Sequence, residues 1–249
     1  MTPETRSLAG EVALVTGAGK RVGRAIALEL ARAGADVVVH VGRSVEEGRA
    51  VAAELEALGV RSAVVQADQR DVAAIRRACD EAEARLGPVS LLCNSAAIWP
   101  KVELDALEQE HFDLALEVNL RGPFFWARTL GARMKARGRG AIVSIADVST
   151  DRPWVDSLPY CMAKAGVVSM TYGLAKALAP AVRVNAIGPG PILFPPDYPE
   201  QAKRRDRGAT LRGREGEPAD VARAVRFLME SPNVTGVLLP VDGGYRFGI

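Results

Sequence analysis

The chain has 249 residues, of which 48% are hydrophobic and 25% charged, and its formal net charge of +2 gives no strong attraction to nucleic acid or to a membrane surface. No apolar run approaches the length that spans a bilayer, and the short run after Arg6 is too brief for a signal segment. Three cysteines without a C-x-x-C spacing and two histidines support neither a disulfide framework nor a metal site. We therefore expect a cytoplasmic protein without a metal, whose partners have to be inferred from local motifs.

Short β-branched runs alternate with longer, alanine-rich helical runs throughout the sequence. The predicted strands are 11–16, 36–41, 62–68, 89–95, 141–147, 182–188 and 236–242. The predicted helices are 24–34, 45–59, 72–87, 160–178 and 218–231, with two more helical stretches between the fourth and fifth strands. This alternation predicts an α/β fold with helices on both faces of a parallel sheet, in one domain over residues 1–249. Gly34, Gly59 and Gly87 each follow a helical run, where a left-handed C-cap is expected.

The first strand leads through a glycine-rich loop into a helix in VALVTGAGKRVGRAIALEL. In this context glycine lets the backbone approach a pyrophosphate, while the helix N-terminus offers free N–H groups and the positive end of its dipole. Gly17 and Gly19 have the spacing of the first pair in G-x-G-x-x-G, but Gly23 comes one residue late. A tight turn without a ligand is the alternative. The loop residues expected at a cofactor are Gly17, Gly19, Lys20, Arg21 and Val22.

The end of the second strand indicates which nicotinamide cofactor is used. An acidic residue there would hold the ribose hydroxyls of NAD, whereas an arginine would meet the 2′-phosphate of NADP. This strand ends in HVGRS, without an acid, and Arg43 and Ser44 join Lys20 and Arg21 in a cluster suited to a doubly charged phosphate. The cluster favours NADPH over NADH. Solvated surface charge is the alternative, mainly for Arg43 taken alone.

Several further motifs follow one another along the chain. They are T-G-x-x-x-x-x-G in the first loop (Thr16, Gly17, Gly23), Asp68 after the third strand, NSAA at 94–97, Asn119, Tyr160-x-x-x-Lys164, Pro189-Gly190 and VDGG at 241–244. With them the sequence resembles the short-chain dehydrogenase/reductase family over essentially its whole length. The resemblance implies a Rossmann-like, doubly wound, seven-stranded parallel sheet flanked by helices, commonly assembled as a homotetramer. It also implies hydride transfer between a nicotinamide and a carbonyl, alcohol or imine.

The resemblance adds to the residues expected at NADP(H). Besides the first loop and Arg43 with Ser44, they are His40, Asp68, Asn94, Ser95, Ala96, Tyr160, Lys164, Pro189, Gly190 and Ile192. It also implies that Asn119 binds the backbone and a water that links Lys164 to solvent.

Tyr160 and Lys164 lie one turn apart on one helix face. An ammonium near the phenol would lower its pKa and make it a usable proton donor at neutral pH. Lys164 would also hydrogen-bond the cofactor ribose. Two residues that share a helix by chance are the alternative.

Asp147 stands thirteen residues before Tyr160, where most members of the family have a serine that orients the substrate carbonyl. A carboxylate facing an ordinary ketone would repel the developing charge, so either Asp147 is protonated or the substrate is not a ketone. Capping or bracing the loop before Pro153 is the alternative role for Asp147.

One subgroup that the sequence resembles, the pteridine and dihydropterin reductases, carries this aspartate. GKRVG, HVGRS and GPGPILFP are similar to its loops, and its counterpart of Arg21 faces both the cofactor phosphate and the pterin. Trp99 stands where the relatives sandwich the pterin between an aromatic ring and the nicotinamide. Ala97, where the subgroup often has serine, departs from the pattern. A core or interface position for Trp99, and a phosphate contact alone for Arg21, are the alternatives.

The expected activity is NADPH-dependent hydride transfer to a C=N bond of a dihydropterin or dihydrofolate, with substrate contacts from Arg21, Trp99, Asp147 and Tyr160. A buried Asp147 bonded to Tyr160 would relay the proton that the nitrogen needs. One alternative is a reductase of a ketone such as a 3-oxoacyl thioester. Another is a non-catalytic NADPH-binding sensor, which has little need for a tuned phenol.

Two regions of the sequence remain without a single interpretation. The basic segment 203–214 either attracts an acidic tail, such as a folate glutamate, or is a solvated surface. The sequence also leaves open whether Arg246 of a neighbouring subunit enters the active site.

Overall fold

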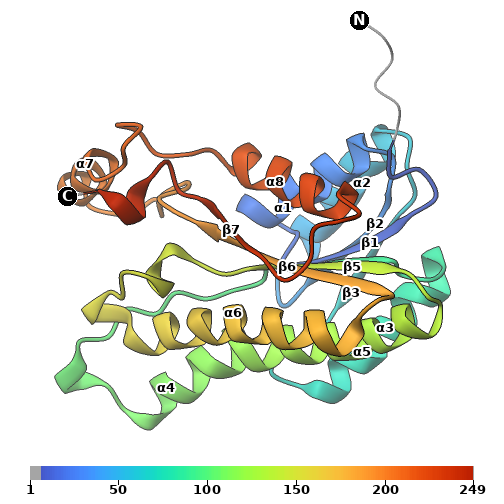
Figure 1. Cartoon of the computed structure of the whole chain (residues 1–249), viewed down its shortest axis with the longest axis horizontal. Helices are drawn as coiled ribbons and strands as arrows, with labels where there is room; N and C mark the ends of the chain where they lie inside the picture. The colour runs from blue at the N-terminus through green and yellow to red at the C-terminus, as the bar shows by residue number, and fades with distance from the viewer. Residues whose placement is uncertain (1–6, 249) are drawn as a thin grey trace, which may run out of the picture.

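The computed structural model describes residues 7–248 and is built around one seven-stranded parallel sheet (Figure 1). The strands are β1 (Val12–Thr16), β2 (Asp36–Val41), β3 (Ser62–Gln66), β4 (Leu91–Asn94), β5 (Gly140–Ile145), β6 (Val182–Pro189) and β7 (Leu238–Val241). Their order in the sheet is β3-β2-β1-β4-β5-β6-β7, so the winding reverses between β1 and β4. The predicted fold class, a doubly wound Rossmann-like sheet, is confirmed.

Helices cover both faces of the sheet (Figure 1). One face carries α1 (Arg21–Arg32), α2 (Val45–Ala57) and α8 (Pro218–Glu230). The other carries α3 (Val72–Leu86), α4 (Gln109–Leu116), α5 (Gly122–Ala136) and α6 (Leu158–Leu178). A short helix, α7 (Glu200–Gly208), lies at the same end of the molecule as the C-terminus.

The core forms as two layers because each helix turns an apolar stripe towards the sheet. Every residue of β1 is buried, as expected for a parallel strand that is covered on both faces. Ile26 of α1 and Val225 of α8 are fully buried in one layer, while Trp126 and Leu130 of α5 are fully buried in the other. Burying a side chain of this size stabilises the fold by about 1.5–3 kcal/mol.

The predicted elements agree with the observed ones to within a few residues. The two helical stretches after the fourth strand are α4 and α5, which a π-helical turn, Glu117–Arg121, joins without a break. Gly34 and Gly59 have the expected positive φ. Gly87 also has positive φ, but its ψ of −175° lies outside the left-handed helical region, so it is not a left-handed cap.

The topology decides where a site can form. Because all seven strands are parallel, the loops that follow β1, β4, β5 and β6 meet at one edge of the sheet, beside the reversal between β1 and β4. Within residues 7–248, no helix has both the length and the apolar character needed to cross a membrane.

Candidate active site

The loop after β1 is shaped by two glycines. Gly17 has φ of +67°, and a Cβ on it would lie 2.8 Å from Ala96 Cα. A Cβ on Gly23 would lie 2.3 Å from the Gly17 carbonyl oxygen, so only glycine lets α1 begin this close to the loop. The loop therefore presents the first N–H groups of α1 as an anion site does.

Cationic side chains gather near this helix N-terminus. Lys20, the N-cap of α1, makes no side-chain cap, and the first turn of the helix holds no acid. The loop after β2 packs beside it, since a Cβ on Gly19 would lie 3.6 Å from the Ser44 carbonyl oxygen. In the described part of the chain Lys20 and Arg43 form no ion pair, whereas neighbouring Arg49 does. Their charges are thus available to a phosphate.

Asp68 lies just beyond β3 at the same edge of the sheet. It pairs with Arg70, and the shortest distance between their side chains is 2.6 Å. The hydrogen bond from Arg70 lowers the pKa of Asp68, and the charge of nearby Arg43 adds to this effect. Asp68 is therefore a half-exposed carboxylate close to the cationic loop.

His40, which the sequence places at the cofactor, has its side chain buried beneath the first loop. Its Nε2 lies 3.0 Å from the Ala67 carbonyl oxygen and must donate to it. That leaves Nδ1 to accept from the Gly17 N–H at 3.4 Å. Burial lowers the pKa of His40 to about 4, so the ring is neutral at pH 7. The His40 ring thus supports the loop from below through two hydrogen bonds to the backbone.

The segment after β4 lies against the end of β1. The N–H groups of Ser95 and Ala96 donate to Thr16 Oγ1 at 2.9 and 3.0 Å. Asn94 is buried, and its Nδ2 donates to the Ser144 hydroxyl at 3.2 Å. Asn94 thus ties β4 to β5 through its side chain.

Asp147 and Tyr160 meet in the wall of a cavity. The Tyr160 hydroxyl donates to Asp147 Oδ2 at 2.8 Å, while the Ser149 N–H donates to Oδ1 at 2.8 Å. Burial raises the pKa of the Asp147 carboxyl, although these hydrogen bonds and the charge of Lys164 act against the rise. One oxygen of Asp147 thus bonds Tyr160, as the relay hypothesis requires, and the other braces the loop before Pro153.

Lys164 and Asn119 lie behind this pair, and both are buried. Lys164 Nζ donates to the Ile145 carbonyl oxygen at 2.7 Å. The π-helical turn holds Asn119, whose Oδ1 accepts from the Ile98 N–H at 3.0 Å, so the predicted backbone contact of Asn119 is present. Within residues 7–248 its Nδ2 has no partner, which leaves a buried donor for a water or ligand atom.

The expectation that Lys164 lowers the pKa of Tyr160 is wrong in this structure. Burial, and then the charge and hydrogen bond of Asp147, raise the pKa of the phenol well above its ordinary value. Burial also lowers the pKa of Lys164 to about 8. The carboxylate, and not the ammonium, is hydrogen-bonded to the phenol, so Tyr160 keeps its proton at neutral pH and Asp147 accepts its hydrogen bond.

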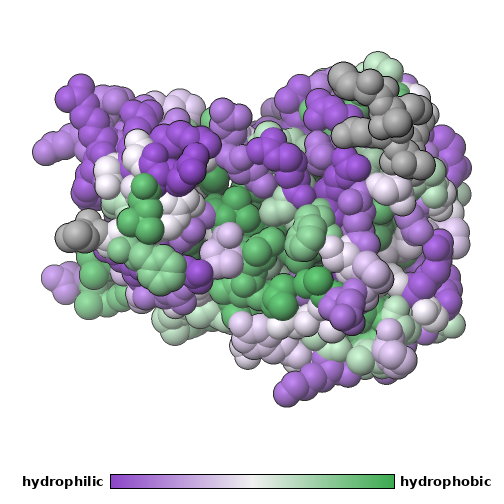
Figure 2. All heavy atoms as spheres, turned by 45° about the horizontal axis from the view of Figure 1, so that its top comes forward, coloured by the Kyte–Doolittle hydropathy of each residue, from purple (hydrophilic) through white to green (hydrophobic). Residues whose placement is uncertain are grey.

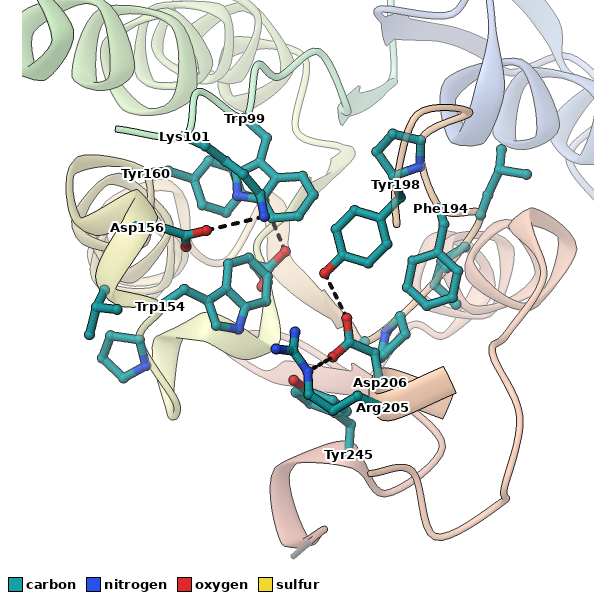
Figure 3. A pocket seen from close by; sticks show the side chains of 18 of the residues that line it. Trp99, Lys101, Trp154, Asp156, Tyr160, Phe194, Tyr198, Arg205, Asp206 and Tyr245 are labelled. Atoms are coloured by element: carbon teal, nitrogen blue, oxygen red, sulfur yellow. Dashed lines mark hydrogen bonds and ion pairs between the residues drawn. The ribbon is translucent and has the colours of Figure 1, made fainter. Parts of the chain in front are cut away.

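The cavity measures about 590 Å³ and has aromatic walls (Figure 3). The ring centroids of Trp99 and Tyr160 are 6.4 Å apart, and the Trp99 indole N–H donates to the Ser157 hydroxyl at 3.1 Å. Trp154 lies nearly parallel to Tyr160, at 7° with centroids 6.1 Å apart. The ring centroid of Tyr198 lies 6.0 Å from that of Trp99. Trp99 thus belongs to the cavity wall rather than to the core.

Sequence reasoning missed most of this wall. Trp154 and Tyr198 carry no motif, and both lie in irregular, proline-containing segments whose path the local sequence does not set. The sequence does contain one signal for these two residues. Each lies in a segment that follows a predicted strand, and such segments gather at the edge of the sheet where the site forms. Figure 2 shows hydrophobic side chains gathered in the hollowed middle of one face, framed by hydrophilic groups.

The loop after β6 closes the site against the C-terminal motif. A Cβ on Gly190 would lie 2.7 Å from Asp242 Cα, so glycine is needed for this approach. Arg21 and Leu193 are the two non-glycine residues with positive φ in the described chain, at 53° and 50°. The Arg21 guanidinium donates to the Leu193 carbonyl oxygen, so the first loop and the loop that holds Ile192 touch here.

Half of the basic residues in the segment 203–214 form ion pairs with acids in and around α7. The pairs are Lys203 with Glu200, Arg205 with Asp206, and Arg207 with Glu200 and Glu215. These pairs involve three of the six basic residues in the segment. Of those six, only Arg205 lines the cavity. This pairing favours the solvated-surface interpretation of the segment over a site for an acidic tail. Tyr245 of this chain also lines the cavity.

Several known proteins are similar to this chain in sequence and in structure. A family model described as Enoyl-(Acyl carrier protein) reductase matches residues 17–246. The chain is 37% identical over 243 residues to a Streptomyces violaceoruber protein named as ketoacyl reductase 2 of the granaticin polyketide synthase, covering 94% of this chain and 95% of that one. It is 31% identical over 237 residues to 3-oxoacyl-[acyl-carrier-protein] reductase FabG of Staphylococcus aureus, covering 93% and 96%. The structure of FolM alternative dihydrofolate reductase 1 from Brucella suis, in complex with NADP, has a TM-score of 0.91 at 31% identity and covers 97% of both chains.

The chain belongs to the short-chain dehydrogenase/reductase family, and it is an oxidoreductase that uses NADPH or NADP+. Several similar solved structures hold NADP or NADPH. The residues present here fit that cofactor. The glycines at 17 and 23 leave a cradle that a Cβ would fill, and Lys20 and Arg43, which form no ion pair within residues 7–248, would be the cations to hold a 2′-phosphate.

Proposed function

We propose that the protein reduces a C=N bond of a dihydropterin or dihydrofolate with NADPH. The observation that carries the proposal is the 2.8 Å hydrogen bond from Tyr160 to Asp147, a buried carboxyl in a cavity with aromatic walls. Arg21 and Trp99 line the same cavity. The structural similarity to a protein named as an alternative dihydrofolate reductase supports this substrate class.

Reduction of a C=N bond needs one hydride and one proton. NADPH, when bound, would supply the hydride to carbon, and the nitrogen would need a proton from the protein. Because burial raises its pKa, Asp147 stays protonated to a higher pH than an ordinary aspartate and donates that proton. Tyr160 keeps its own proton, and its hydrogen bond stabilises the carboxylate that remains after Asp147 has donated; Lys164, with a pKa of about 8, is the next exchangeable group on α6.

The wall residues orient a flat substrate. A pterin is planar, so the face of Trp99 offers it a stacking surface worth about 0.5–1.5 kcal/mol. The hydrogen bond from the Trp99 indole to Ser157 fixes the plane of that ring before a ligand enters. A preset ring plane lowers the entropy lost on binding and aligns the carbon for hydride transfer.

Reduction of a ketone is the second candidate. It is favoured by the similarity to the Staphylococcus aureus 3-oxoacyl-[acyl-carrier-protein] reductase. A ketone oxygen would gain negative charge beside Asp147, which opposes the reaction while that carboxyl is ionised. The two candidates therefore make opposite predictions for removal of the carboxyl.

The test is NADPH oxidation by the purified protein with a dihydropterin, dihydrofolate and a 3-oxoacyl thioester in parallel. We expect turnover of a pterin substrate, and a fall in kcat of about 10²–10⁴-fold in Asp147→Ser, because a general acid contributes on that order. The wild-type rate should fall as pH rises through the raised pKa of Asp147, since the donor is its protonated form. Asp151→Ser, an exposed neighbour, is the matched control. Thioester turnover that survives or improves in Asp147→Ser, without pterin turnover, would contradict the proposal.

A further inference from the structure

A charged pair inside the aromatic wall takes no part in the proton relay. Lys101 Nζ lies 3.1 Å from Asp156 Oδ2, and both residues line the cavity (Figure 3). Their side chains are 46% and 31% exposed, so solvent and a ligand both reach the pair. An ion pair with this exposure contributes little to stability, which leaves its position in the cavity to be explained.

Lys101 reaches across the cavity from one wall towards the other. Its Nζ lies 4.7 Å from the ring centroid of Trp99, on the segment after β4, and 5.2 Å from that of Tyr198, on the segment after β6. Cation–π attraction to both rings holds the ammonium between them. The charge of Lys101 is therefore fixed in the space that a substrate on Trp99 would border.

Asp156 connects this ammonium to the orientation of Trp99. Its Oδ1 accepts from the Ser157 hydroxyl at 3.3 Å, and that hydroxyl accepts from the Trp99 indole at 3.1 Å. A ligand group that hydrogen-bonds Lys101 and Asp156 therefore joins the hydrogen-bond network that fixes the orientation of the Trp99 ring.

The charges in the cavity favour a neutral polar group. Lys101 is balanced by Asp156 and Arg205 by Asp206, while Glu103 adds one more acid to the lining. Arg21 also lines the cavity; within residues 7–248 it forms no ion pair, and its guanidinium donates to the Leu193 carbonyl oxygen. A polyanionic tail would therefore meet cations that are mostly compensated by acids or by a carbonyl oxygen. A hydroxyl both donates and accepts, so adjacent hydroxyls fit between an ammonium that only donates and a carboxylate that accepts.

We propose that Lys101 and Asp156 form a specificity subsite for a hydroxylated side chain carried by the substrate ring. This subsite rests on the proposed pterin reduction, because the ring has to lie on Trp99 for its substituent to reach the pair. An apolar acyl chain would desolvate the two charges without replacing their hydrogen bonds, so the subsite selects against it.

The experiment compares two dihydropterins that share one ring, one with a polyhydroxylated side chain and one with a methyl group in its place. The readout is the ratio of their kcat/KM values, in which any loss of folded protein cancels. We expect Lys101→Met to lower this ratio about 10-fold, as the loss of a hydrogen bond to a charged group does, and Lys101→Arg to restore most of it. Lys176→Met, on the surface of α6, is the control and should leave the ratio at its wild-type value.

The outcomes separate the subsite from the reaction. Turnover of both pterins with the same ratio in wild type and Lys101→Met would overturn the subsite and leave pterin reduction standing. Failure of the wild type to turn over either pterin would overturn both. A wild-type preference for a folate with its glutamate tail over the hydroxylated pterin would also overturn the subsite, because the charge argument predicts the reverse.

Discussion

The two halves of the site are built in different ways. The cofactor half comprises the loops after β1 and β2 with Asp68, and it consists mainly of backbone brought close by Gly17 and Gly23. The substrate half is the cavity wall, and it consists mainly of side chains from the segments that follow β4, β5 and β6, with Trp99 after β4 and Trp154 after β5. The first half depends on close approach of the chain to itself, and the second on contacts between rings that are far apart in sequence.

This difference decides what sets the chemistry of each half. In the cofactor half the buried titratable group, His40, is neutral and supports the loop through hydrogen bonds to the backbone. In the substrate half the buried groups, Asp147 and Tyr160, bond each other and line the cavity. Burial shifts the pKa values of all three, but of the three only Asp147 and Tyr160 line the cavity.

The largest expected effect concerns His40 and the acid stability of the cofactor half. Above pH 6.5 the ring is neutral in both the folded and the unfolded chain. Between 6.5 and about 4 the unfolded chain takes up a proton that the folded chain excludes, so the free energy of unfolding should fall by about 3 kcal/mol from this group. Urea unfolding at pH 7 and at pH 4.5 should show this loss in the wild type and a smaller one in His40→Gln.

The matched control for His40 is His111→Gln. His111 accepts from the Glu108 N–H at the start of α4 and is only partly buried. Replacing it should leave the pH dependence of the free energy of unfolding the same as in the wild type. An equal slope in His40→Gln and the wild type would mean that the neutral ring is not what supports the first loop, and the contrast between the two halves would lose its basis.

The same contrast explains which features of the fold and the site could be predicted from the sequence. The sheet, its helices and the first loop were predictable because apolar periodicity and glycine spacing are local signals. The hydrogen bond between Asp147 and Tyr160 was predicted through a family resemblance, and the structure contains it. The burial of His40 was not predictable, because a histidine that ends a strand gives no sign of the face to which it points.

The aromatic wall shows the remaining limit. Trp154 and Tyr198 lie forty-four residues apart in sequence and meet the same cavity only because parallel strands bring their loops to one edge. The raised pKa of Tyr160 was missed for a related reason. Helix spacing places Lys164 near the phenol, but it does not show that a carboxylate holds the hydroxyl and that the ammonium bonds Ile145 instead.

A second prediction concerns the cofactor half and the choice between NADPH and NADH. Arg43 forms no ion pair within residues 7–248, so its loss should remove attraction to a 2′-phosphate without breaking a contact of the protein. We expect Arg43→Ala to raise the Kd of NADPH about 30-fold, or about 2 kcal/mol, and to change that of NADH little. Binding titrations check this, with Arg49→Ala on α2 as the control. Equal weakening for both cofactors would place Arg43 away from the 2′-phosphate.

The smallest expected effect tests whether the halves act separately. Trp154 packs on Tyr160 and lies 5.3 Å from Trp99 between ring centroids, and each such aromatic pair contributes about 0.5–1.5 kcal/mol. Trp154→Leu should therefore lower kcat/KM for the cavity substrate about 5-fold and leave the Kd of NADPH at its wild-type value, whereas Trp154→Phe should retain most of the rate. The halves touch where Arg21 bonds the Leu193 carbonyl oxygen. If Trp154→Leu weakens NADPH binding as much as it slows turnover, that contact couples them, and the site has to be treated as one unit.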